Sequence, residues 1–246
     1  MRIAVVIVLL ALTGCVSTGN AIDKSKMAEG YFQKGLAYFQ DKNYELSSVE
    51  FHRSIQTDSS NKLSWYYLGV ISDVQGKLEE AIRFYKEAIR LDGDFSEAYN
   101  ALGAVYSKQQ KWSEAIKNYQ KALENKLYTT PHIPYLNMGR VYMAQKDYAK
   151  AVESYRDAKR FVNQDFIIYE LGSALFEAGR IKEAIAELQE GVGLAPQDAG
   201  MRYGLALAFL KDGNKKAAAI EFKKAAELAP KSEIAKKANE YLKTLR

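Results

Sequence analysis

The sequence predicts an all-α solenoid of stacked helix pairs, and three observations support this fold class. One column of small residues recurs at steps of 34, 34, 36, 33 and 34, namely Gly35, Gly69, Gly103, Gly139, Gly172 and Ala206. Large side chains recur at fixed distances from this column, at spacings that keep them on one helical face. Loop signals separate the helical stretches, and Pro196 and Pro230 mark turns between units. A period near 34 residues is typical of helix–turn–helix repeats.

The first predicted element is a signal peptide at residues 1–14. Arg2 precedes an apolar run that ends at Leu12 and is too short to span a bilayer as a helix. The following residues, Leu12-Thr13-Gly14-Cys15, resemble the bacterial lipobox. This resemblance implies that Cys15 is lipidated, becomes the N-terminus and anchors the chain through several acyl chains, palmitate among them. An ordinary signal peptide, or a cysteine present by chance, is the alternative.

Cys15 is the only cysteine in the chain, so the mature protein would carry no free thiol and no disulfide. That composition suits an oxidising periplasm. Val16 replaces the aspartate that retains lipoproteins at the inner membrane under the enteric sorting rule. We therefore expect attachment to the outer membrane on its periplasmic face. Residues 15–27 are small and polar, and we expect them to form the lipidated cysteine and a flexible tether.

The repeats occupy residues 28–232 and are followed by a basic closing segment. The six units fall at 28–61, 62–95, 96–129, 132–165, 165–198 and 199–232. The second unit carries Trp65, Leu68-Gly69, Ala81, Tyr85 and Ala88 in register, and these columns resemble the tetratricopeptide repeat (TPR) family. The resemblance implies a right-handed superhelix that binds other proteins. Residues 233–246 are predicted to form a capping helix.

In TPR proteins, the first helix of each unit lines the concave face through its second, fifth, ninth and twelfth positions. Carried onto the first two units, these positions include apolar residues that the repeat's own packing does not require. We predict that they form a groove for a hydrophobic or amphipathic peptide, consisting of Phe32, Leu36, Phe39, Tyr66 and Val70. The alternative is that these side chains pack against a neighbouring helix or the tether.

The step of 36 residues marks an insertion between the third and fourth units. Pro131 and Pro134 predict an extended, non-helical loop here, and Tyr128 is a second candidate for partner binding. The leucine-tyrosine, the proline and the glycine of the next helix resemble the type IV pilus biogenesis lipoproteins, the pilotin family (PilF/PilW). That family combines a lipobox with six such repeats and helps the pilus secretin to assemble in the outer membrane. A spacer that adjusts superhelical pitch is the alternative reading of this loop.

The sequence offers no set of residues for catalysis or for a cofactor. The two histidines, His52 and His132, lie eighty residues apart, and no HExxH, GxSxG or Walker motif is present. We expect neither an enzyme nor a metal or cofactor site, and no small-molecule substrate.

The net charge of +5 arises at the C-terminal end. Residues 211–246 contain ten Lys or Arg and five Asp or Glu, without the interleaved aromatics typical of nucleic-acid binding. A solvated cap is expected, and an acidic partner or anionic envelope component is the alternative. Together these features predict an outer-membrane pilotin that binds a protein partner, possibly a secretin subunit. The alternative is a general envelope scaffold for polysaccharide export or cell-wall enzymes.

Overall fold

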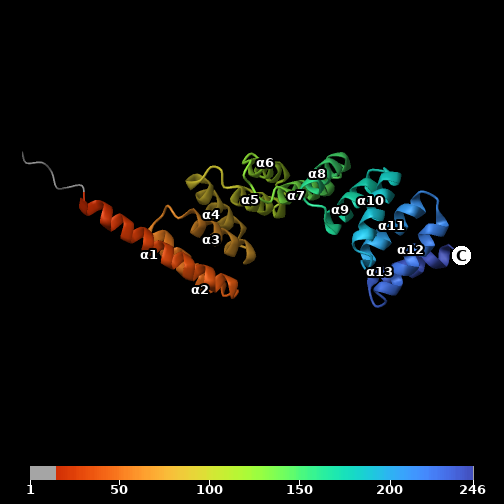
Figure 1. Cartoon of the computed structure of the whole chain (residues 1–246), viewed down its shortest axis with the longest axis horizontal. Helices are drawn as coiled ribbons and strands as arrows, with labels where there is room; N and C mark the ends of the chain where they lie inside the picture. The colour runs from red at the N-terminus through yellow and green to blue at the C-terminus, as the bar shows by residue number, and fades with distance from the viewer. Residues whose placement is uncertain (1–14, 246) are drawn as a thin grey trace, which may run out of the picture. The chain divides into compact units, whose positions relative to one another are not determined.

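The computed structural model describes residues 15–245, with side chains described from residue 23 onward, and this part of the chain is all-α (Figure 1). Thirteen helices follow one another in this part, as six consecutive pairs and a final single helix. The structure thus confirms the predicted fold class of six repeats and a capping helix. The predicted signal peptide at residues 1–14 lies outside the described residues, as does the side chain of Cys15.

The chain divides after Val105 into two compact units, which are described separately. The N-terminal unit contains α1 (Cys15–Gln40), α2 (Tyr44–Thr57), α3 (Lys62–Val74), α4 (Leu78–Leu91) and most of α5 (Ser96–Lys108). Its helices pack in sequence, α1 against α2, α2 against α3 and α3 against α4. Its core forms around the buried side chains of Phe32, Phe51, Leu68 and Ile71.

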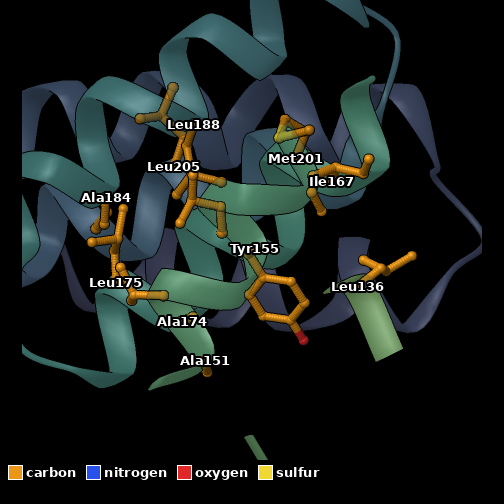
Figure 2. Close-up of a cluster of buried hydrophobic side chains, with 14 residues drawn as sticks. Leu136, Ala151, Tyr155, Ile167, Ala174, Leu175, Ala184, Leu188, Met201 and Leu205 are labelled. Atoms are coloured by element: carbon orange, nitrogen blue, oxygen red, sulfur yellow. The ribbon is translucent and has the colours of Figure 1, made fainter. Parts of the chain in front are cut away.

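The C-terminal unit contains α6 (Trp112–Ala122), α7 (His132–Ala144), α8 (Tyr148–Phe161), α9 (Asp165–Glu177), α10 (Ile181–Leu194), α11 (Ala199–Lys211), α12 (Lys215–Leu228) and α13 (Glu233–Thr244). Figure 2 shows its main core, in which Tyr155, Leu175, Leu188 and Met201 are buried together. The capping helix α13 packs against α12, where the ring of Tyr241 stacks on Phe222 at a centroid distance of 4.8 Å.

The recurring glycine column exists because a large side chain of the second helix lies directly on the first. A Cβ atom added to Gly69 would lie 2.6 Å from Cε1 of Tyr85, and one added to Gly172 would lie 2.6 Å from Cγ of Leu188. Real Cβ contacts do not approach so closely, so a larger residue at Gly69 or Gly172 requires the facing side chain or the helices to shift. The column therefore marks the closest approach within each pair.

The first pair is held by serine hydroxyl groups at positions where the other pairs have alanine or, in one case, glycine. Ser47 Oγ donates to the carbonyl oxygen of Gly35 at 2.9 Å, and Ser54 Oγ donates to that of Ala28 at 2.9 Å. Ser64 Oγ in turn donates to Ser54 Oγ at 2.8 Å, which links α3 to the same network. Because each buried hydroxyl has a partner, serine fills the small-residue positions without an unsatisfied polar group.

Two local expectations differ from the structure. Residues 15–27 form the N-terminal half of α1 instead of a flexible tether. Ala28 is buried and bonded to Ser54, so the packed part of α1 supplies a helical nucleus, and no proline interrupts its extension toward the N-terminus. Side chains 23–27 are nevertheless exposed.

The predicted non-helical loop is also shorter than expected, because α7 begins at His132 and includes Pro134. Pro134 is the third residue of this helix, where a backbone N–H has no partner within the helix to lose. Pro131 precedes the helix as its N-cap, with φ −65°. Two prolines in four residues therefore start a helix here and do not prevent one.

Candidate protein-binding surfaces

The predicted groove residues come from the first helices of the first two repeats. Phe32, Leu36 and Phe39 lie on α1, and Tyr66 and Val70 lie on α3. We call these five residues the first-groove set. Leu36, Phe39, Tyr66 and Val70 are half-buried, so each keeps some surface that a partner could contact.

Phe32 corrects one part of the expectation, because the packing of the N-terminal unit does require it. Its side chain is only 4% exposed and belongs to the core with Phe51 and Leu68. Its ring lies 5.7 Å from that of Phe51, within the range of favourable aromatic pairs. Phe32 is therefore a core residue and offers a partner almost no surface.

Tyr67 fills the space between the first two repeats. Its ring stacks on Phe51 at 5.3 Å and 19°, and contacts the edge of Phe39 at 5.2 Å and 70°. The centre of the Phe32 ring lies 6.0 Å from that of Tyr67. The groove predicted between Phe32 and Phe39 is thus occupied by a side chain of the protein itself.

Tyr66 points to the next pair of helices and forms a second aromatic cluster. Its ring lies 5.2 Å from Phe95 and 5.8 Å from Tyr85. Burial, followed by the neighbouring Tyr66 and Asp73, raises the pKa of the Tyr85 hydroxyl far above its ordinary value. Tyr85 is therefore neutral across the physiological range. What stays open on this face is a narrow apolar strip of half-buried residues.

The loop candidates are largely buried in the C-terminal unit. Tyr128 is 9% exposed and Pro134 is buried, while Pro131 is half-buried. The exposed apolar residue of this loop is Leu127, at 87%. If a partner reads this loop, it would contact Leu127, which the sequence analysis did not single out.

The five repeat positions of the first-groove set line an open hollow between the fifth and sixth repeats. Relative to Gly172 and Ala206, the positions of the first-groove set are held by Tyr169, Ser173, Phe176, Tyr203 and Leu207. All five line one hollow of about 130 Å³, which Leu188, Gly204 and Glu177 complete. We call it the C-terminal hollow. The sequence analysis carried the positional rule only onto the first three repeats and therefore did not identify this hollow, although the same rule locates its lining positions.

Carboxylates lie near the two tyrosines of the hollow, and Lys237 lines a surface pocket together with Tyr203 and Glu240. Glu177 is the charged residue among those that line the hollow. Burial raises the pKa of the Tyr169 hydroxyl, and the nearby carboxylates of Asp198 and Glu170 raise it further. Burial likewise raises the pKa of Tyr203, with Tyr241 and Glu240 adding to the effect. Both phenols are therefore protonated near neutral pH and can donate a hydrogen bond.

The described residues form neither a metal-binding cluster nor a membrane-spanning helix. No three His, Cys, Asp or Glu side chains gather there as a metal ion would require. None of the described helices combines the length and apolar character needed to cross a membrane.

Comparison with protein families places most of the repeats. Models described as tetratricopeptide repeat match residues 96–126, 134–161 and 169–233, and one described as TPR repeat matches residues 75–110. The human tetratricopeptide repeat protein 13 is 31% identical over 82 residues, which are 33% of this chain and 10% of that protein. The chain thus spans a small part of that relative.

Solved structures share the fold over most of the chain. PilF of Pseudomonas aeruginosa matches with a TM-score of 0.74 at 20% identity, covering 89% of this chain and 99% of that one. PilW, a type IV pilus biogenesis factor, matches with a TM-score of 0.71 at 19% identity, covering 89% and 97%. YrrB, a TPR protein with an unusual peptide-binding site, matches with a TM-score of 0.65 at 21% identity, covering 77% and 97%.

These matches and the helix pairs agree on one assignment. The family is a protein-binding scaffold and is not catalytic, as the sequence analysis expected. The chain is a tetratricopeptide repeat protein.

Proposed function

We propose that this chain is an outer-membrane lipoprotein of the pilotin type, which binds the secretin of a type IV pilus and assists its assembly. The observation that carries the proposal is the end-to-end match with PilF and PilW, which this chain covers over 99% and 97% of their lengths. YrrB matches a smaller share of this chain. Lipidation of Cys15 in the Leu12-Thr13-Gly14-Cys15 stretch would supply the membrane anchor that the proposal needs.

The proposed mechanism combines a lipid anchor with an apolar binding surface. Acyl chains on Cys15 would hold the repeats at the periplasmic face of the outer membrane. The apolar strip formed by Leu36, Phe39, Tyr66 and Val70 would contact an apolar segment of the secretin subunit. Covering that segment would keep it from aggregating until the multimer forms.

Deletion of the gene tests the proposal directly. We expect loss of secretin multimers and of surface pili, and restoration by the wild-type gene. Cys15→Ser should fail to restore multimers at the outer membrane while the protein still accumulates. Intact multimers with normal twitching motility in the deletion strain would contradict the proposal and favour a scaffold for another envelope complex.

A pair of surface variants separates the strip from the rest of the molecule. Val70→Lys places a charge on the half-buried strip of α3 and should reduce capture of the secretin subunit. Val49→Lys places the same charge on the second helix α2, where the side chain is 46% exposed, and should leave capture unchanged. Equal capture by both variants would move the secretin site away from α3.

A further inference from the structure

The C-terminal hollow and the space filled by Tyr67 in the N-terminal unit correspond to each other by repeat position. Tyr67 is two residues before the repeat marker Gly69, and Gly204 is two residues before the marker Ala206. The neighbours of Tyr67 are Phe32, Phe39 and Phe51, and the residues in the same three positions around Gly204 are Tyr169, Phe176 and Leu188. The walls are therefore retained between the two sites, while the ring that fills the first is missing from the second.

The environment of Gly204 shows that the space is real. An added Cβ would lie 3.5 Å from Cε2 of Tyr169 and 3.6 Å from Cδ2 of Leu188, both ordinary contact distances. At Gly172, an added Cβ would instead lie 2.6 Å from the same Leu188 side chain. The side chain of Leu188, labelled in Figure 2, thus lies closer to the backbone of α9 at Gly172 than to that of α11 at Gly204, and the difference leaves room beside Gly204.

The size and lining of the hollow fit one side chain. Protein cavities of about 150 Å³ lined by apolar side chains hold a single benzene ring. The hollow has a volume of about 130 Å³ and is walled by Tyr169, Phe176, Leu188, Tyr203 and Leu207. A volume of this size matches one phenylalanine or tyrosine ring, and in the first two repeats the ring of Tyr67 packs against the residues that hold three of the same repeat positions.

The charge of Glu177 further restricts the chemical class of ligand that the hollow can bind. Glu177 lines the hollow, and the charged groups that act on Tyr169 and Tyr203 are the carboxylates of Asp198, Glu170 and Glu240. Glu170 is already paired with Arg140 at 3.0 Å, whereas Glu177 is 4 positions after Ser173 on the lining face of α9. A cation next to the inserted ring would meet a carboxylate, and an anion would be repelled.

We propose that the C-terminal hollow binds the phenylalanine or tyrosine side chain of a partner protein, next to a lysine or arginine that pairs with Glu177. The inserted ring takes the place that Tyr67 occupies between the first two repeats. This site goes beyond the proposed pilotin role, because it lies on α9 and α11 and its ligand is defined without reference to a secretin.

Small aromatic probes test the site on the purified full-length chain in mild detergent. Tyramine carries a phenol and a cation, p-cresol carries the phenol alone, and 4-hydroxyphenylacetate carries a phenol and an anion. We expect NMR shifts at Tyr169 and Tyr203 with tyramine binding about two to five times more tightly than p-cresol, since an exposed ion pair contributes little. The anion should bind most weakly. Glu177→Gln should remove the difference between tyramine and p-cresol.

Filling the hollow is the decisive variant. Gly204→Tyr supplies the missing ring and should abolish tyramine binding while the chain keeps its helicity. Gly193→Tyr makes the same change on α10, where an added Cβ meets nothing within 4 Å, and should bind tyramine like the wild type. Gly204→Ala, which the contact distances tolerate, should weaken binding without affecting the fold.

Three results would overturn the site. They are no shift at Tyr169 or Tyr203 with any probe, unchanged tyramine binding by a folded Gly204→Tyr variant, or a dimer that Gly204→Tyr dissociates, which would make a second copy the occupant. A failed secretin assay combined with tyramine binding lost in Gly204→Tyr would reject the pilotin role and keep this site.

Discussion

The first and last pairs of adjacent repeats use the same positions to reach opposite results. Between the first two repeats, Tyr67 occupies the space against Phe51 and closes the groove. Between the fifth and sixth, Gly204 leaves the corresponding space against Leu188 open. The comparison teaches that the concave positions of a repeat define where a groove can form, and that one further residue decides whether it is open.

The largest expected effect comes from the equivalent aromatic residues Phe32 and Tyr169, each three residues before a repeat marker. Phe32→Ala removes a ring that is 4% exposed and should lower the free energy of unfolding by about 3–5 kcal/mol. Tyr169 is 40% exposed, so Tyr169→Ala should cost about 1 kcal/mol or less. Urea titration, with hydrogen exchange to assign each transition to its helices, measures both.

Similar losses for the two variants would mean that Tyr169 belongs to the core and does not form the wall of an open site. Because Phe32 is buried, Phe32→Glu is unsuitable as a variant for testing partner binding. A buried carboxylate without a partner would unfold the first repeats before any contact with a partner could be assessed.

The second prediction concerns removal of the Tyr67 ring that fills the space between the first two repeats. Tyr67→Ala should destabilise the N-terminal repeats by about 2–3 kcal/mol, less than a fully buried ring, and leave a hollow walled by Phe32, Phe39 and Phe51. Added p-cresol should then restore part of the lost stability, because a ligand that binds only the folded state shifts the unfolding equilibrium. The measurement is the urea midpoint with and without p-cresol.

The control for this rescue is the Gly204→Tyr background, in which the C-terminal hollow is filled and cannot bind the phenol. A Tyr67→Ala chain in that background that gains nothing from p-cresol would show that the two regions are not equivalent. Rescue would show that the walls alone suffice to bind an aromatic ring.

The third prediction compares alanine substitutions at Gly172 and Gly204, which both face Leu188. Gly172→Ala brings a Cβ to 2.6 Å from Leu188 and should destabilise the fifth repeat by about 1–3 kcal/mol. Gly204→Ala brings a Cβ to 3.6 Å from the same side chain and should stabilise by up to about 1 kcal/mol through helix propensity. Thermal unfolding monitored by circular dichroism should therefore move in opposite directions, and shifts of the same sign would contradict the open space at Gly204.

The sequence was sufficient for the helix pairs because the small residues and large side chains recur at fixed spacings. The repeat positions of Leu36 and Val70 are held by Ser173 and Leu207 in the hollow, so the residues that line it can be located from the sequence, whereas their binding role stays a prediction. The sequence could not show which groove was open, because the position of Tyr67 and Gly204 is not among the concave positions of the repeat. That position faces the neighbouring pair, so its role appears only when two repeats are packed together.

Two local errors have a different origin. Pro134 was interpreted as a helix breaker, although a proline in the first turn of a helix breaks no hydrogen bond. Residues 15–27 were expected to be a tether from their polarity, although helix extension depends on the packed residues that follow, beginning at Ala28. In both cases the conformation depends on where the residue lies in its helix and not on residue type alone.

The smallest expected effect concerns the ion pair that fastens the helix carrying Tyr67. Lys62 on α3 donates to the carboxylate of Asp92 after α4, and its ammonium also lies 5.1 Å from the ring centre of Phe95. This hydrogen bond from Lys62, with a second from the backbone N–H of Asp94, holds the pKa of Asp92 below its ordinary value of 3.8. A lowered folded pKa means that the pair contributes stability above 3.8 and loses it as the pH falls through the folded value.

Lys62→Met keeps the aliphatic stem and removes the charge, and should cost at most about 1 kcal/mol near neutral pH because the pair is partly exposed. The difference from wild type in urea midpoint should narrow on acidification but not vanish, since the contact of Lys62 with Phe95 does not depend on Asp92. Asp92→Asn removes only the titrating group, so its difference from wild type should disappear at acidic pH. A difference for Asp92→Asn that persists there would show that the α3–α4 connection, and with it the position of Tyr67, depends on the geometry of this side chain and not on its charge.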